Sequence, residues 1–217
     1  LLYDQDKIEE SIILFQQAIR IRNDYTNAYY NLGKAYQAQG NPQAAIAAYD
    51  QVLKILPDSA ETRFNRSLSL LLTEKYEEGW LEYEQRFSNL KNSAKKWNKK
   101  DAHRWDGASF VGKRLLVVDE QGIGDTLQFI RYLPMVKELG GTVIFETIGS
   151  LMRLLENFQG IDERWNRSSV ERSNTDFDLY IPLMSLPGIF NTSLETIPDR
   201  VPYIFPDPTK TQYWQRQ

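Results

Sequence analysis

Apolar residues in the first third of the chain recur with the spacing of helices. Between Asp24 and Asp58 they fall three, four or seven positions apart, in two segments that meet at Gly40-Asn41-Pro42. The large apolar residues of the two segments are Tyr29, Leu32, Tyr36, Ile46, Tyr49 and Leu53. This spacing puts them on one face of each helix, and a proline suits the first turn of the second helix. The pattern therefore predicts a hairpin of two antiparallel helices.

The order of these residues resembles the tetratricopeptide (TPR) repeat. Small Gly33 stands where two antiparallel helices must approach closely. A shift of 34 residues supports the resemblance, because it maps Tyr49 forward onto Tyr83 and backward onto Phe15. Such repeats need neighbours to cover their apolar faces. We expect residues 1–90 to form one partial and two complete repeats.

Two asparagines point to a partner for these repeats. Asn31 and Asn65 occupy the same place in successive repeats, on the first helix, which lines the concave face. TPR grooves usually bind extended peptides or partner helices. The pair resembles the asparagine ladder of O-GlcNAc transferase repeats, where amides hold a peptide backbone. The resemblance implies a peptide or protein partner at Asn31 and Asn65; the alternative is that Asn is merely common there.

The periodicity changes after the repeats. Residues 91–112 start with a basic run that reads as a solvated linker rather than as a phosphate-binding or nucleic-acid-binding segment. Strand-like apolar runs then alternate with helical patterns, which predicts βαβ units and a parallel sheet. The expected strands are 114–120, 142–147, 163–166 and 177–182, with a possible edge strand at 203–205. The expected helices are 126–139, kinked at Pro134, and 150–158. The predicted fold is multidomain, α and α/β, with a Rossmann-like domain over residues 113–206.

The first strand-to-helix turn of that domain is the candidate site. Ligands of open parallel α/β sheets collect at the carboxyl ends of the strands. Gly122 and Gly124 allow close approach of the backbone to a ligand, and the following helix N-terminus favours negative charge. The turn is not a dinucleotide fingerprint, because Leu127 replaces the third glycine and Asp125 puts an acid where a pyrophosphate would lie. An NAD site is therefore disfavoured.

Asp125 allows two interpretations. As a helix N-cap with Gln128 three residues later, it would form a capping box. As a carboxylate at the mouth of a parallel sheet, it could take a proton from an attacking sugar hydroxyl. The residues alone favour the cap, and the two roles are compatible only if the side chain can rotate away from the helix amides.

Longer phrases extend the resemblance to sugar transfer. The Gly124-Asp125 pair followed by Pro134 resembles the start of heptosyltransferases, which have the two-Rossmann GT-B architecture and whose Asp in this turn is the proposed general base. The wider set of phrases resembles bacterial TPR-containing glycosyltransferase-like proteins; it comprises residues 77–80, 105–107, 120–125, 185–187, 197–198 and 202–203. This resemblance implies that Asp125 is catalytic. It implies that the acceptor is bound by Glu120, Gln121, Gly122, Gly124 and Gln128.

The implied activity is sugar transfer from a nucleotide-sugar donor to a hydroxyl acceptor, inverting and independent of any metal. In the GT-B family the second Rossmann half binds the nucleotide-sugar. Residues 207–217 would begin the connection to that missing half, and the chain starts with Leu rather than Met. We therefore expect a fragment that is inactive alone. The alternative is a non-catalytic TPR scaffold for protein interaction.

Composition and charge bear on metal sites, nucleic-acid binding and membrane spans. The 217 residues include no Cys and only one His, His103, which removes thiol chemistry and multi-His metal sites, so no metal or cofactor is expected. A net charge of −3 argues against nucleic acid as a partner. No apolar run approaches the ~18 residues of a membrane span, and the N-terminus does not read as a signal peptide. We expect a cytoplasmic protein, and the resemblance described above implies a bacterial one.

Overall fold

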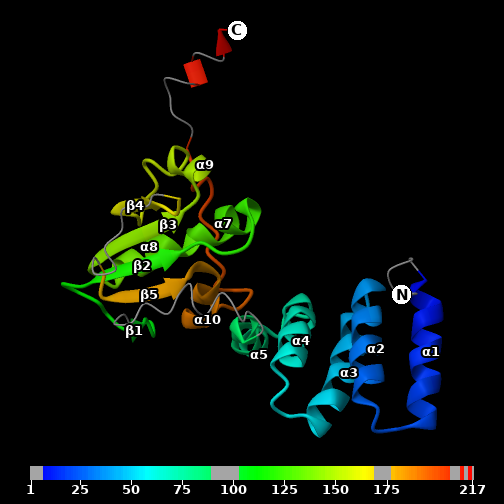
Figure 1. Cartoon of the computed structure of the whole chain (residues 1–217). Coiled ribbons are helices and arrows are strands. Elements are labelled where there is room, and N and C mark those ends of the chain that lie inside the picture. Colours follow the sequence, from blue (N-terminus) through cyan, green and yellow to red (C-terminus); the bar gives the residue numbers. More distant parts are fainter. Residues whose placement is uncertain (1–6, 89–102, 169–176, 206–210, 213–214, 217) are drawn as a thin grey trace. The chain divides into compact units, whose positions relative to one another are not determined.

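The computed structural model describes residues 7–88, 103–168, 177–205, 211–212 and 215–216 (Figure 1). The chain divides into two compact units. The first holds the helical repeats and also includes Asn191–Glu195. The second holds the sheet with its helices and the residues from Thr196 onward.

The first unit is a row of antiparallel helices. They are α1 (Ile8–Ile21), α2 (Thr26–Ala38), α3 (Pro42–Ile55), α4 (Ala60–Leu72) and α5 (Tyr76–Tyr83), followed by the 3-10 turn η2 (Glu84–Phe87). Pro42 is the first residue of α3, as predicted, and the side chain of Asn41 caps that helix by accepting from the Ala44 N–H at 3.1 Å. The predicted helical hairpin is confirmed.

Close packing of α2 on α3 depends on Gly33. A Cβ atom at this position would lie 2.5 Å from Cε1 of Tyr49. Tyr49 is fully buried, and its hydroxyl donates a hydrogen bond to Oε1 of Gln37 at 2.7 Å. The ring therefore fills the space that a side chain at Gly33 would take, which explains why a small residue stands there.

Ion pairs connect three consecutive helices of the first unit. Arg66 of α4 contacts Asp50 of α3 at 2.7 Å, and it contacts Glu78 and Glu82 of α5 at 2.7 and 2.9 Å. Arg63 adds a second contact to Glu82 at 3.1 Å. Arg66 and Glu82 are largely buried. Removing one of the two charges would therefore destabilise the fold, because the other would remain buried without this partner.

The second unit is built on a five-stranded parallel sheet. Its strands are β1 (His103–Arg104), β2 (Arg114–Val118), β3 (Thr142–Thr147), β4 (Glu163–Asn166) and β5 (Leu179–Pro182), in the order β1-β5-β2-β3-β4. Four successive residues of β2, from Leu115 on, are buried, as expected for a central strand covered on both faces. The predicted parallel α/β arrangement is confirmed.

The helices of this unit are short. They are α7 (Ile123–Phe129), the 3-10 turn η3 (Ile130–Tyr132), α8 (Leu133–Glu138), α9 (Gly149–Met152), the 3-10 turn η4 (Leu183–Ser185) and α10 (Leu186–Ile189). The single kinked helix expected at 126–139 is therefore three pieces, and Pro134 lies in the first turn of α8, where its missing N–H costs little.

Three other predictions were wrong. The helix expected at 150–158 ends at Met152, and residues 203–205 form no strand. The linker expected at 91–112 is described only from residue 103, and there it belongs to the sheet unit. Trp105 and Phe110 are buried in the core with their rings edge to face, 5.7 Å apart. Most of 207–217 lies outside the described residues.

Candidate functional site

The order of the strands places the predicted site at a topological switch point. The chain leaves β2 for β3 on one side, whereas β5 lies on the other side of β2. Open α/β sheets bind ligands in the crevice at the carboxyl ends of two such strands. Residues 119–122 follow β2, and η4 follows β5. The turn singled out in the sequence is thus located where the topology favours a ligand.

Glu120 connects the two loops at this point. Its side chain is half-buried, and Oε1 accepts a hydrogen bond from the backbone N–H of Met184 at 3.1 Å. The loop after β2 and the loop after β5 are therefore held together by a carboxylate. This contact fixes the spacing of the two loops at the switch point.

Asp125 lies in the first turn of α7, and it is not the N-cap. Gly122 is the N-cap, and the Asp125 side chain reaches back so that Oδ2 accepts from the Gly122 N–H at 3.0 Å. The prediction of a capping box from Asp125 to Gln128 was wrong. The reason is the left-handed backbone of Gln121, with φ of 62°, which turns the chain sharply and starts the helix at Ile123.

The other predicted acceptor residues lie on the same turn. Gln121, Gly122, Gly124 and Gln128 are exposed, whereas Asp125 is half-buried. A Cβ atom at Gly124 would meet nothing within 4 Å, so local packing does not require glycine there. The end of β2 and the start of α7 therefore bring all six predicted acceptor-side residues together, and the exposed part is formed by the two glycines and by the side chains of Gln121 and Gln128.

A buried polar network behind the turn was missed in the sequence. Asp119 is 4% exposed. It accepts from the Thr147 hydroxyl at 2.5 Å and forms an ion pair with Arg167, which also donates to the Asp119 carbonyl oxygen at 2.6 Å. Glu146 lies 4.0 Å from the same guanidinium. The network ties together the carboxyl ends of β2, β3 and β4. Its available signal was an acid directly after the apolar run of β2.

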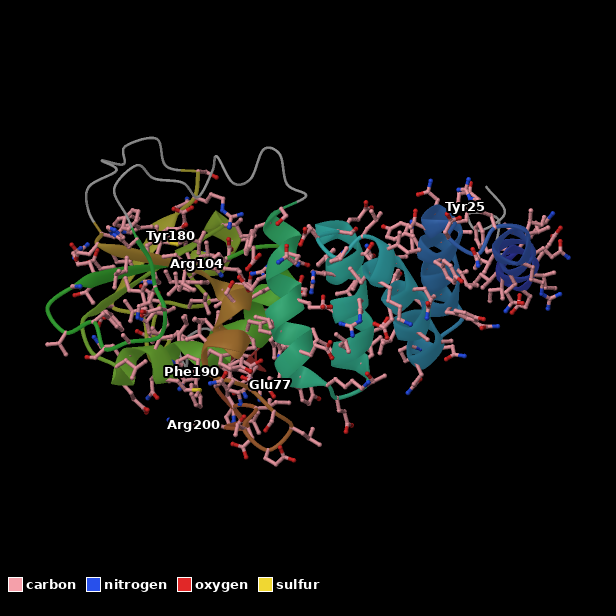
Figure 2. All side chains as sticks on the ribbon, turned by 90° about the horizontal axis from the view of Figure 1, so that it is seen from below. Tyr25, Glu77, Arg104, Tyr180, Phe190 and Arg200 are labelled. Carbon is pink, nitrogen blue, oxygen red and sulfur yellow. The ribbon has the colours of Figure 1, made fainter. Side chains whose placement is uncertain are left out.

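A basic side chain also reaches the loop after β5. Arg104 of β1 pairs in register with Tyr180 of β5, and the two side chains are labelled near each other in Figure 2. Its guanidinium donates to the Ser185 hydroxyl at 3.0 Å. The sequence gives no sign of this role: Arg104 lies within the range 91–112 expected to be a linker, and a two-residue strand of exposed residues has no pattern of its own.

The two asparagines of the repeats make internal hydrogen bonds. The amide nitrogen of Asn65 donates to the Tyr30 hydroxyl at 3.1 Å and to the Glu61 carbonyl oxygen at 2.9 Å. That of Asn31 donates to the Asn27 carbonyl oxygen at 2.8 Å. Burial and the hydrogen bond to Glu61 raise the pKa of Tyr30. A peptide on this face would therefore meet the amide oxygen of Asn65 more readily than its N–H groups.

Neither a metal-binding cluster nor a membrane-spanning helix is present in the described residues. In ranges 7–88, 103–168, 177–205, 211–212 and 215–216, no three His, Cys, Asp or Glu side chains are grouped so that they could hold a metal ion. Within the same ranges, no helix has both the length and the apolar character needed to cross a membrane.

Comparison with known proteins supports the repeats directly. Residues 1–40 match a family model described as TPR repeat, and residues 26–59 match the model of the tetratricopeptide repeat. The prediction of TPR repeats is therefore confirmed for this part of the chain.

Two longer proteins are similar over most of the chain. Protein FlbA of Caulobacter vibrioides is 28% identical over 225 residues, which cover 95% of this chain and 38% of the relative. The structure of a mutant O-GlcNAc transferase of Thermobaculum terrenum is 14% identical with a TM-score of 0.38, over 74% of this chain and 38% of that one. This score is too low to establish a common fold, so the architecture above rests on the chain's own structure.

Proposed function

We propose that this chain is the TPR and acceptor-side part of a glycosyltransferase, which transfers a sugar from a nucleotide-sugar to a hydroxyl acceptor. The observation that carries the proposal is the place of Asp125, a half-buried carboxylate in the first turn of α7, next to the switch point of the sheet. Acceptor hydroxyls would be bound by this connection, through Glu120, Gln121, Gly122, Gly124 and Gln128. A peptide or protein partner would lie along the repeats, at Asn31 and Asn65.

The reaction assigns one proton transfer to this chain. The acceptor oxygen forms a bond to the anomeric carbon while the bond from that carbon to the diphosphate breaks, and the nucleoside diphosphate leaves. Asp125 takes the hydroxyl proton. Attack from the face opposite the leaving group inverts the anomeric carbon, and the proposed mechanism uses no metal.

The two carboxylate oxygens of Asp125 allow both of its interpretations at once. Oδ2 accepts from the Gly122 N–H, whereas Oδ1 makes no hydrogen bond with any other described residue. A general base needs one oxygen within about 3 Å of the proton it removes. Because helix capping uses the other oxygen, the side chain can act as a base without leaving the helix N-terminus.

The donor belongs to a longer protein in this proposal. The chain spans 38% of the length of Protein FlbA, and the nucleotide-sugar would be bound mainly by a C-terminal half outside this chain. We propose that the complete protein works in the bacterial cytoplasm.

The test is turnover of the full-length protein carrying Asp125→Asn. An Asn can still accept from the Gly122 N–H, so folding should be retained while the base is lost. We expect sugar transfer from UDP-, GDP- or ADP-sugars to fall by ~10²–10⁴-fold with acceptor affinity retained. Asp106→Asn is the matched control, because Asp106 accepts from the Ala108 N–H at 3.0 Å in an exposed turn. Normal turnover by the Asp125→Asn protein would refute the proposal.

One observation favours a second candidate, a non-catalytic TPR scaffold. Both carboxylates at the switch point hold backbone N–H groups, Asp125 that of Gly122 and Glu120 that of Met184. If the two carboxylates only hold these backbone N–H groups, Asp125→Asn should change neither partner binding nor any activity of the full-length protein. Asp125→Ala would then lower only the free energy of unfolding, by ~1 kcal/mol, as expected for a lost cap.

A further inference from the structure

The second unit contains a cavity away from the switch point. Its volume is about 620 Å³. It is enclosed by η3 and α8, by residues 153–159 after α9, and by residues 198–205. None of the six proposed acceptor-side residues lines it. The cavity therefore has no part in the function proposed above.

The walls of the cavity suit a single apolar molecule. They include Pro134 and Met135 of α8, Phe158, Pro202 and Tyr203. Phe158 is buried, and Met135 and Tyr203 pack against the core of the unit. The core packing therefore holds these three wall residues in place. The volume lies in the range of pockets that take a drug-sized ligand, ~300–1,000 Å³.

The charges around the cavity are not equivalent. Six charged side chains line it: Arg131, Arg153, Arg200, Glu138, Glu156 and Asp199. Five of them are exposed, whereas Arg131 is partly buried. Figure 2 labels Arg200, whose guanidinium donates to Gln159 at 3.3 Å. The charge withdrawn from water at this cavity is therefore a cation.

Among the described residues, Arg131 has no acidic side chain as an ion-pair partner. Its guanidinium carbon lies 5.4 Å from the centre of the Tyr203 ring, and its Nε atom is buried without a hydrogen-bond partner. No ion pair joins Arg131 to any other residue of the described ranges. Partial burial of an unpaired charge is unfavourable, and planar guanidinium groups bind carboxylates in a bidentate way. An anionic group on a ligand would supply the missing partner.

We propose that this cavity binds a small organic carboxylate with an apolar, ring-sized body. The carboxylate is held by the guanidinium of Arg131. The body lies against Tyr203, Phe158 and Met135. The exposed acids at the cavity, Glu138, Glu156 and Asp199, disfavour ligands of larger negative charge, which is why we assign a monocarboxylate.

Two probes with the same phenylethyl body and opposite charge test the proposal. They are 3-phenylpropionate and 2-phenylethylamine, added to the 217-residue chain and followed by ligand-observed NMR and calorimetry. A molecule of this size is expected to bind with a dissociation constant of about 1 mM. The carboxylate should bind at least ten times more tightly than the amine. Equal binding of both probes, or no saturation by the carboxylate up to about 20 mM, would overturn the assignment.

Variants locate the site. Arg131→Met keeps an apolar stem and should weaken 3-phenylpropionate binding by about tenfold or more. Lys113→Met is the matched control, because Lys113 is an exposed cation of the same unit that does not line the cavity. In the unsubstituted chain, the Nε–H resonance of Arg131 should shift when 3-phenylpropionate is added. This measurement tests the contact even if Arg131→Met does not fold. An unshifted resonance contradicts the proposal.

Discussion

Replacing Gly33 by Ala tests how the repeats are packed. The added Cβ atom would lie 2.5, 2.7 and 2.8 Å from Cε1, Cζ and Cδ1 of Tyr49. An ordinary contact needs at least 3.4 Å, so the ring would have to retreat by about 0.9 Å. The ring has no free space for this movement, because Tyr49 is fully buried and its hydroxyl is bound to Gln37.

Two effects of opposite sign set the magnitude. Overpacking of a filled core typically costs ~1–3 kcal/mol. Replacing Gly by Ala within a helix gains ~1 kcal/mol of intrinsic propensity. Since the clash involves a whole buried ring edge and not the end of a flexible side chain, we expect overpacking to prevail. The net loss should be ~1–2 kcal/mol of unfolding free energy.

The assay is urea denaturation followed by far-UV circular dichroism, together with hydrogen exchange of peptides covering 26–55. Ala47→Gly, at an exposed position of α3, measures the propensity term alone. The background Tyr49→Leu removes the ring, so Gly33→Ala should there become neutral or stabilising. If Gly33→Ala stabilises the unsubstituted protein, or costs the same in both backgrounds, the packing argument is refuted.

Two further predictions concern charged groups. Arg66→Leu leaves Glu82, whose side chain is 7% exposed, with Arg63 as its remaining partner. The substitution should lower the free energy of unfolding, measured by urea denaturation, by up to about 3 kcal/mol. The control Arg20→Leu, at an exposed position, should change it little. Burial raises the pKa of Asp162, but hydrogen bonds from Lys137 and the Val143 N–H outweigh it and hold the pKa below its ordinary value. The carboxylate therefore stabilises the fold at pH values above the ordinary pKa of an Asp side chain, and this contribution is lost as the pH falls through the lowered pKa. The stability difference between Asp162→Asn and the unsubstituted protein should therefore shrink on acidification. A stability difference between the two proteins that does not change with pH would contradict this assignment.

The sequence by itself determined the elements whose signal is local. The apolar residues of α2 and α3 recur every three or four positions, which places them on one face of each helix. Together with Pro42 at the start of α3, this spacing specifies a helical hairpin. The apolar run of β2 likewise specifies a buried central strand, and the turn after it places Asp125 and its neighbours together because they are contiguous in the chain.

Tertiary structure decided what depends on residues distant in the sequence. Helix α7 begins at Ile123 because the left-handed backbone of Gln121 turns the chain after β2, and this moved Asp125 from the N-cap into the first turn. Trp105 became core because the sheet unit covers it.

Contacts across the chain show the physical reason most clearly. The carboxylate of Asp119 is buried only because Arg167, 48 residues later, reaches it from beyond β4. The cavity at Arg131 exists only because residues 198–205 form one of its walls. The acid directly after the apolar run of β2 is a local sign of the first feature, but the ion pair and the cavity themselves are created by groups that are distant in the sequence and surround them in space.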